Sequence, residues 1–251
     1  MTSGQPFIYY VGQASTLFFY LMILMFYVFV SNYTPPGKAT GEMRVVDDYW
    51  YMFITVWNFA AQIFFLGTAV CDILLRAWHG PSELQRFVHK TRSYIFHAYV
   101  VPMTLLTVSV FWCLYHYDRS LIYAEPLDVL VPNWLNHTLH TTIIIPIIVE
   151  FLLPKHEGFI SAKTAVIGIT ILMVIYQALH DWIYHSTGIF LYPFYKGMGF
   201  GTRLICIFFL YILTCAFAVF GVYVQDLKKP SSSGRRSRAQ RQRERVHPHN
   251  E

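Results

Sequence analysis

The chain has 251 residues, of which 55% are hydrophobic and 13% charged, with a formal net charge of +5. Charged residues supply about a quarter of an ordinary soluble chain, and here they collect between long apolar stretches. This distribution excludes a soluble globular protein and indicates a polytopic membrane protein. Much of the positive charge lies in the last 24 residues, so the basic character does not indicate a nucleic-acid partner.

Six segments are apolar and long enough to cross a bilayer, which takes roughly 20 residues. In chain order they are residues 10–31, 49–71, 94–116, 133–153, 164–185 and 203–224. Lipid cannot satisfy unpaired backbone groups, so the expected fold is all-α, a polytopic transmembrane helical bundle of about six spans. Residues 1–225 are expected to form the transmembrane domain, and residues 226–251 a disordered basic tail.

The basic tail determines the predicted orientation. Lys and Arg favour the cytoplasmic side of a membrane, so the C-terminus is expected in the cytoplasm, with the tail against anionic lipid. With six spans the N-terminus is cytoplasmic too, and the second and fourth spans run from outside to inside. Nothing in the sequence indicates an oligomeric state.

Polar side chains gather on one face of the second predicted span. Thr55, Asn58 and Gln62 are spaced by three and four residues, which places them on one side of a helix. Such groups commonly hydrogen-bond between spans. Taken alone, this face therefore favours helix association over catalysis.

The fourth predicted span contains two histidines three residues apart, His137 and His140. Asn136 lies four residues before His140, so both face the same side of a helix. Polar and ionisable groups inside a bilayer are costly and are usually retained for function. Glu150, near the inner end of this span, is expected to reach the interface or to pair with Lys155.

The end of the fifth predicted span carries a third polar group: Gln177, His180, Asp181 and His185. Three interpretations are open, namely a metal cluster, a group supporting catalysis, or the interfacial end of the helix. Tyr184 and Tyr192 nearby are typical of an aromatic belt at the membrane surface.

The predicted topology places two of these groups at one depth. Thr55 is six residues into the second span and His140 seven residues into the fourth. At about 1.5 Å per residue, both lie roughly 9–10 Å below the outer surface. A hydroxyl and an imidazole are therefore expected at the same level.

Several blocks of the sequence resemble the androgen-induced gene 1 family, which includes the androgen-dependent regulator of tissue factor pathway inhibitor. The blocks are Phe111-Trp-Cys-Leu-Tyr-His-Tyr-Asp-Arg-Ser-Leu-Ile-Tyr123, Trp134-Leu-Asn-His-Thr-Leu-His-Thr-Thr142, His185-Ser-Thr-Gly188 with Tyr192-Pro193, and the second span from Phe53 to Phe65. The resemblance covers about residues 10–225 and leaves out the basic tail.

The resemblance implies a multi-pass membrane hydrolase that cleaves fatty acid esters of hydroxy fatty acids, without a cofactor. It implies Thr55 as the nucleophile and His140 as the general base. His137 and His185 match further histidines of the family blocks, and spacing alone makes Asn58 and Asn136 candidates for supporting roles. The expected partners are a lipid ester substrate and membrane lipids. The resemblance favours the plasma membrane, whereas arginine clusters in the tail leave the endoplasmic reticulum open.

Two other functions compete with this prediction. A metal-dependent membrane hydrolase would use imidazole and carboxylate ligands, which His137, His140, Asp181 and His185 supply. A transporter or receptor would use the same polar groups to hold a lipid or small molecule. Cys71, Cys113, Cys206 and Cys215 match no zinc spacing and no disulfide framework.

Overall fold

The computed structural model describes residues 12, 16, 17, 20, 21, 48–122, 133–152 and 160–227. Over these residues the chain is helical without a strand, and five helical segments are long and apolar enough to cross a membrane. They are Ile54–Ala77, Ser82–Tyr117, Asn133–Leu152, Ala162–Thr187 and Phe200–Asp226. The prediction of an all-α transmembrane bundle is confirmed.

Two predicted parts of the chain lie outside this description. Nearly all of the first predicted span, residues 10–31, is one of them, and the basic tail from residue 228 is the other. The division into a transmembrane domain and a tail therefore stays a prediction.

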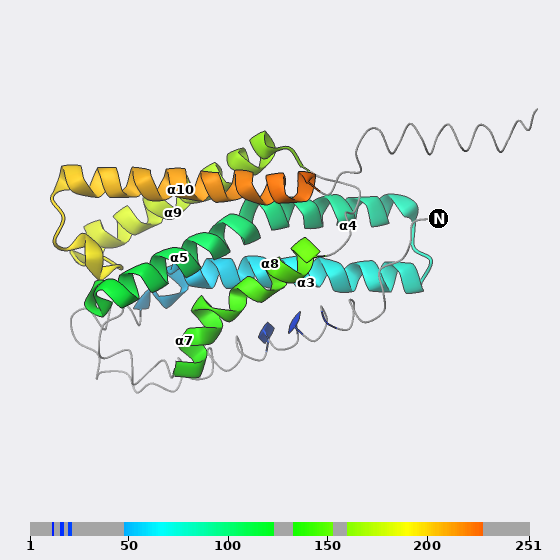
Figure 1. Cartoon of the computed structure of the whole chain (residues 1–251), viewed down its shortest axis with the longest axis horizontal. Coiled ribbons are helices and arrows are strands. Elements are labelled where there is room, and N and C mark those ends of the chain that lie inside the picture. Colours follow the sequence, from blue (N-terminus) through cyan, green and yellow to red (C-terminus); the bar gives the residue numbers. More distant parts are fainter. Residues whose placement is uncertain are drawn as a thin grey trace, which may run out of the picture.

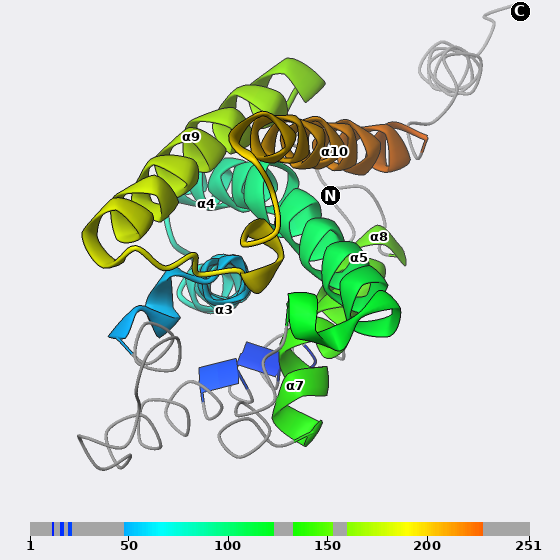
Figure 2. The same ribbon diagram turned by 90° about the vertical axis from the view of Figure 1, so that its left-hand side faces the viewer.

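The helices form two antiparallel pairs (Figure 1). The fourth predicted span, Asn133–Leu152, is broken in the middle and lies across them. Helix α3 (Ile54–Ala77) pairs with α4 (Ser82–Ile95), and α4 continues into α5 (Val101–Tyr117). Helices α9 (Ala162–Thr187) and α10 (Phe200–Asp226) form the second pair. Seen end-on, α9, α10, α5 and α7 stand in an arc around the first turn of α3 (Figure 2).

Close approach of α9 and α10 to the long central helix depends on two glycines. A Cβ at Gly168 of α9 would come within 2.7 Å of the Tyr94 hydroxyl, and one at Gly221 of α10 within 2.9 Å of Val101. Small residues at such contacts let membrane helices pack backbone to backbone. The two glycines thereby bring α9 and α10 against the α4–α5 helix.

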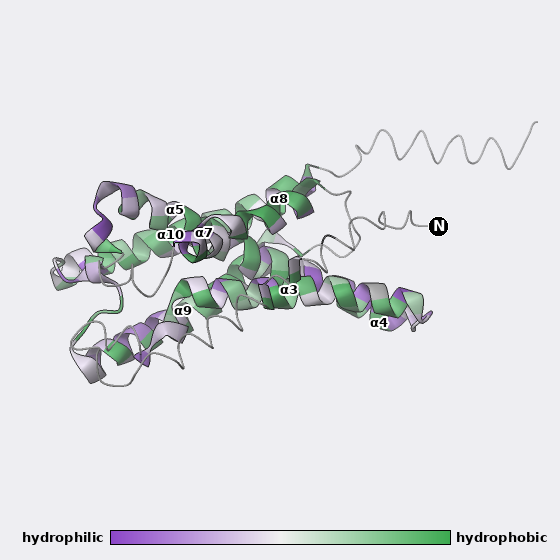
Figure 3. Ribbon diagram, turned by 90° about the horizontal axis from the view of Figure 1, so that it is seen from below, coloured by the Kyte–Doolittle hydropathy of each residue, from purple (hydrophilic) through white to green (hydrophobic). Residues whose placement is uncertain are grey.

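The third predicted span, residues 94–116, is the second part of a longer helix. The segment Ser82–Tyr117 has 36 residues, which at 1.5 Å per residue is about 54 Å, against a hydrocarbon core of about 30 Å. Its first part, α4, is rich in charged residues, and hydrophilic colouring runs along it in Figure 3. A π-helical turn, Phe96–Val100, joins α4 to α5 just before Pro102, which has no amide hydrogen to donate.

The fourth span is broken in the middle. Helix α7 (Asn133–His140) ends at His140, a 3-10 turn covers Thr142–Ile144, and α8 (Ile145–Leu152) follows. Carbonyls released by such a break need donors, because lipid offers none. The Trp112 indole of α5 donates to the His140 carbonyl (3.0 Å), and the Gln62 amide of α3 donates to the Ile143 carbonyl (2.9 Å).

A buried polar network also joins α3 to α5. The Gln62 Nε2 donates to the Thr104 hydroxyl, and this hydroxyl donates to Asn58 Oδ1, each over 2.9 Å. All three side chains are fully buried. Asn58 and Gln62 thus associate two helices, as expected of Asn and Gln within membrane spans.

A buried ion pair links α4 to α8. Glu150 accepts from the Arg92 guanidinium at 2.7 Å, and the guanidinium lies 4.8 Å from the centre of the Phe65 ring. Both charged side chains are about nine-tenths buried. The expectation that Glu150 reaches the interface was wrong, because Arg92 from another helix binds its carboxylate inside the bundle. Lys155, the other expected partner, lies outside the described residues.

Removal of the Glu150 carboxylate should destabilise the protein strongly. Glu150→Ala leaves a buried guanidinium without this partner, which costs about 3–5 kcal/mol of unfolding free energy. The double variant Arg92→Met/Glu150→Leu should regain much of the loss, because neither charge remains to be buried. Thermal denaturation in detergent measures both, with Glu83→Ala, an exposed carboxylate, as the control. Equal melting temperatures for Glu150→Ala and Glu83→Ala would contradict the prediction.

Candidate active site

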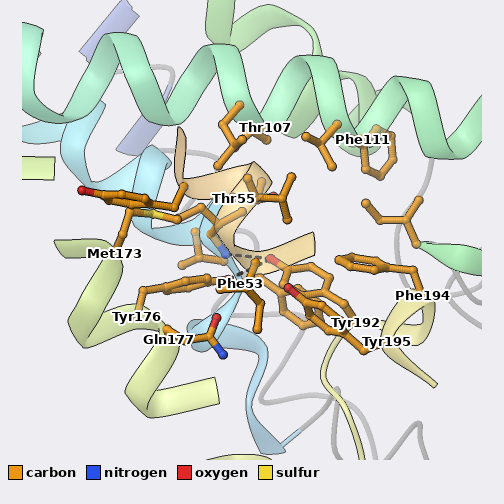
Figure 4. Close-up of a pocket in the computed structure, with 18 of the residues that line it drawn as sticks. Phe53, Thr55, Thr107, Phe111, Met173, Tyr176, Gln177, Tyr192, Phe194 and Tyr195 are labelled. Atoms are coloured by element: carbon orange, nitrogen blue, oxygen red, sulfur yellow. Dashed lines mark hydrogen bonds between the residues drawn. The ribbon is translucent and has the colours of Figure 1, made fainter. Parts of the chain in front are cut away.

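A cavity of about 560 Å³ lies between the first turn of α3, α5, the end of α7, and helices α9 and α10. Figure 4 shows it as a mainly apolar and aromatic chamber. Its volume is within the range of about 300–1,000 Å³ usual for ligand sites. The polar groups on its wall are few, and Thr55, Thr107, His140 and Gln177 are among them.

Two residues from different spans meet at this cavity. The Thr55 Oγ1 lies 3.3 Å from the His140 Nε2. Thr55 is the second residue of α3, and His140 is the last residue of α7. Helix α3 begins at residue 54 and not at 49 as predicted, so Thr55 occupies the first turn of its helix instead of lying six residues inside it.

The hydrogen bonds of His140 define which ring nitrogen carries the proton. Its Nδ1 lies 2.8 Å from Asn136 Oδ1 and 3.0 Å from the Asn136 carbonyl oxygen. Both partners are acceptors, so Nδ1 is the protonated nitrogen. The Nε2 atom is then an acceptor, and the Thr55 hydroxyl donates to it.

Helix α5 holds the imidazole in place. The Phe111 ring stacks on the His140 ring with 3.5 Å between centroids and 9° between planes. The neighbouring Trp112 donates to the His140 carbonyl. The ring plane and the backbone of His140 are therefore both constrained from one helix.

The remaining predicted site residues lie away from the cavity wall. Asn58 belongs to the network with Thr104 one turn below Thr55. His137 is exposed on α7, where its ring stacks on Trp112 and its Nδ1 is 3.2 Å from the Thr141 hydroxyl. His185 is exposed near the end of α9.

The residues proposed as metal ligands are not brought together. Gln177 donates to Asp181 at 2.9 Å, and this carboxylate is exposed on α9. Within residues 48–122, 133–152 and 160–227, no three His, Cys, Asp or Glu side chains lie close enough to bind a metal ion. The described part of the chain therefore offers no ligand set for the metal-dependent hydrolase.

Tyr192, assigned above to an aromatic belt, closes the first turn of α3. Its hydroxyl accepts from the Ile54 amide (3.1 Å) and bonds the Tyr176 hydroxyl (2.9 Å). Burial raises the pKa of Tyr192, so this group is a neutral phenol at neutral pH. The ring of His180 stacks on that of Tyr192 at 5.3 Å. The only signal for this role in the sequence was the Tyr192-Pro193 pair within a family-like block.

The chain matches the family described as FAR-17a/AIG1-like protein over residues 15–226. It belongs to this family. FAR-17a/AIG1-like relatives include the androgen-dependent TFPI-regulating protein of Mesocricetus auratus, 32% identical over 86% of this chain and 94% of the relative. The human androgen-induced gene 1 protein is 31% identical over 71% of this chain and 79% of its own length. No solved structure matches the chain.

Family membership and the apolar helices together make the chain a multi-pass FAR-17a/AIG1-like membrane protein. The resemblance noted from the sequence blocks is confirmed. The names of the relatives describe regulation by androgen and, for one, regulation of TFPI. They state no chemical reaction.

Loss of the Tyr192 hydroxyl should destabilise the FAR-17a/AIG1-like bundle at the α3 end. Tyr192→Phe leaves the Ile54 amide and the Tyr176 hydroxyl without this partner, at a cost of about 1–3 kcal/mol. Thermal denaturation in detergent measures the loss. Tyr184→Phe is the matched control, because Tyr184 contacts Phe190 through its ring at 4.0 Å. An equal melting temperature for both variants would refute the assigned role.

Proposed function

We propose that the protein is an intramembrane threonine hydrolase that cleaves fatty acid esters of hydroxy fatty acids into a fatty acid and a hydroxy fatty acid. The observation that carries the proposal is the 3.3 Å contact between the Thr55 hydroxyl and the His140 imidazole at an apolar cavity. A threonine hydroxyl is a weak nucleophile unless a base lies beside it. Asn136 orients that base through Nδ1.

The reaction proceeds in two half-reactions. The Thr55 oxygen attacks the ester carbonyl carbon while its proton passes to His140 Nε2, giving a tetrahedral intermediate. The intermediate collapses, the bond to the hydroxy fatty acid oxygen breaks, and His140 returns the proton to that oxygen. Water then attacks the acyl-Thr55 with His140 again as base, and the fatty acid leaves.

The ends of two helices suit the charges that develop during this reaction. Thr55 lies in the first turn of α3, and His140 is the last residue of α7. A helix carries partial positive charge at its N-terminus and partial negative charge at its C-terminus. The oxyanion forms beside the first of these ends, and the imidazolium beside the second.

The shape and lining of the cavity support a lipid substrate. Three of its lining residues, Val174 of α9 and Leu204 and Phe208 of α10, are at least half exposed on the outer face of the bundle. Apolar side chains exposed there face the bilayer. An acyl chain can therefore reach the cavity from lipid along α9 and α10, while the substrate carboxylate stays at the headgroups.

The orientation and compartment form part of the same proposal. The site lies at the outer end of α3, in the plasma membrane, and the C-terminus is cytoplasmic. The basic tail there contacts anionic lipid. No cofactor takes part in the reaction.

Loss of either member of the Thr–His pair should abolish ester hydrolysis. Thr55→Ala and His140→Ala each remove a group needed in both half-reactions, so kcat should fall by roughly 10³-fold or more. The assay follows fatty acid released from a branched lipid ester by purified protein. A fluorophosphonate probe should label wild type at Thr55 and leave Thr55→Ala unlabelled.

Two variants control for general damage. Thr68→Ala changes a threonine of the same helix, and His185→Ala changes an exposed histidine; both should keep wild-type rates. Turnover by Thr55→Ala at the wild-type rate would show that another residue is the nucleophile. A purified wild-type protein that binds the ester without cleaving it would favour a transporter or receptor.

Asn136 should contribute less than the pair itself. Asn136→Ala removes one of the two acceptors of His140 Nδ1 and keeps the other, the backbone carbonyl of the same residue. We expect kcat to fall by about 10–100-fold, which is less than the loss for His140→Ala. Steady-state kinetics on the same ester measures it. A loss equal to that of His140→Ala would mean that Asn136 does more than orient the ring.

A further inference from the structure

One hydroxyl group on the cavity wall has no assigned role. Thr107 of α5 lines the cavity with only 4% of its surface exposed, and its Oγ1 is buried without a hydrogen-bond partner. A buried polar group left unpaired costs about 1–3 kcal/mol. Buried polar groups without a partner are uncommon in native proteins, and they often have a functional role.

Seven other hydroxyls in the five spans donate to a backbone carbonyl three or four residues earlier, a common arrangement in membrane helices. They are those of Thr68, Ser109, Thr138, Thr142, Thr170, Thr187 and Thr214. The Thr107 hydroxyl makes no such bond, so it is free to bond a molecule in the cavity.

The pairing of α3 with α5 places Thr107 beside the proposed nucleophile. The two helices are antiparallel, and Asn58 of α3 bonds Thr104 of α5. One turn further along each helix, in the direction of the cavity, come Thr55 and Thr107. Both side chains line the cavity and are labelled in Figure 4.

A backbone donor is present at the same point. The first amides of α3 are engaged at Ile54, which donates to Tyr192, and at Val56 and Trp57, which donate to the Phe53 carbonyl. Among the hydrogen bonds of the described residues, none uses the amide of Thr55. The amide at the start of a helix is a good donor to an anion.

We propose that the Thr107 hydroxyl and the Thr55 amide form the oxyanion site of the hydrolase. This inference rests on the function proposed above. When the Thr55 oxygen bonds the carbonyl carbon, the carbonyl π electrons move to the oxygen, and both donors hold that oxygen while keeping their protons. The electron pair returns when the bond to the leaving oxygen breaks. Donors placed where charge develops stabilise the transition state more than the ground state.

Thr107→Val tests the proposal, because valine has the shape of threonine without the hydroxyl. We expect kcat for the lipid ester to fall by about 10²–10³-fold with little change in KM. Labelling of Thr55 by the fluorophosphonate should slow in parallel, because the phosphoryl oxygen takes the same position. Thr107→Ser should recover most of both rates. Thr214→Val, at a buried threonine that bonds the Leu210 carbonyl, should leave both rates unchanged.

The melting temperature distinguishes the oxyanion role of Thr107 from a purely structural one. A structural role predicts that Thr107→Val lowers the melting temperature and leaves kcat unchanged, and the oxyanion role predicts the reverse. Because the hydroxyl is buried and unpaired, Thr107→Val should melt at or above the wild-type temperature although it is slower. A lower melting temperature with wild-type kcat would overturn the oxyanion proposal.

The two proposals fail in distinguishable ways. Wild-type hydrolysis and labelling by Thr107→Val, with both lost in Thr55→Ala, would overturn the oxyanion site and leave the hydrolase standing. Hydrolysis that persists in Thr55→Ala and His140→Ala would overturn the hydrolase mechanism and the oxyanion site with it.

Discussion

The break in the fourth span is the feature on which the rest of the structure depends. Lipid cannot supply donors to the carbonyls that the break releases at His140 and Ile143. Trp112 of α5 and Gln62 of α3 supply these donors. The hydrogen bonds at the break therefore connect the fourth span to both α3 and α5. Because His140 lies at that break, the bonds that repair the backbone also set the position of the imidazole opposite Thr55.

Hydropathy was enough to predict the architecture, since the cost of burying polar groups in lipid acts on every residue of a span. The five spans within the described residues all lie where apolar runs predicted them. Two details depended on other forces. Helix α3 starts late because Trp50–Met52 forms a separate 3-10 turn before it, and α4 extends the third span because charged residues continue a helix as readily as apolar ones do.

The Thr55–His140 contact was within reach of sequence reasoning only in part. Periodicity showed that each residue lies on a polar face, but spacing within one helix says nothing about which helices touch. The family resemblance was what indicated that the second and fourth spans contribute the Thr–His pair. Thr107 and Tyr192 were missed for a different reason: threonine in a helix usually bonds its own backbone, and tyrosine near a span end usually marks the interface. Only the three-dimensional contacts distinguish them from those common cases.

The position of Thr55 in the first turn of α3 has a consequence for the acyl-enzyme of the proposed mechanism. Helix α3 has 24 residues, about 36 Å, so its first turn lies near the edge of a hydrocarbon core of about 30 Å. An acyl-threonine ester deep in the hydrocarbon core would meet little water, so hydrolysis would be slow there and the acyl group could pass to the hydroxyl of another substrate molecule. At the edge, interfacial water is the abundant acceptor, so the proposed intermediate would be hydrolysed in preference to transferring its acyl group to another hydroxyl.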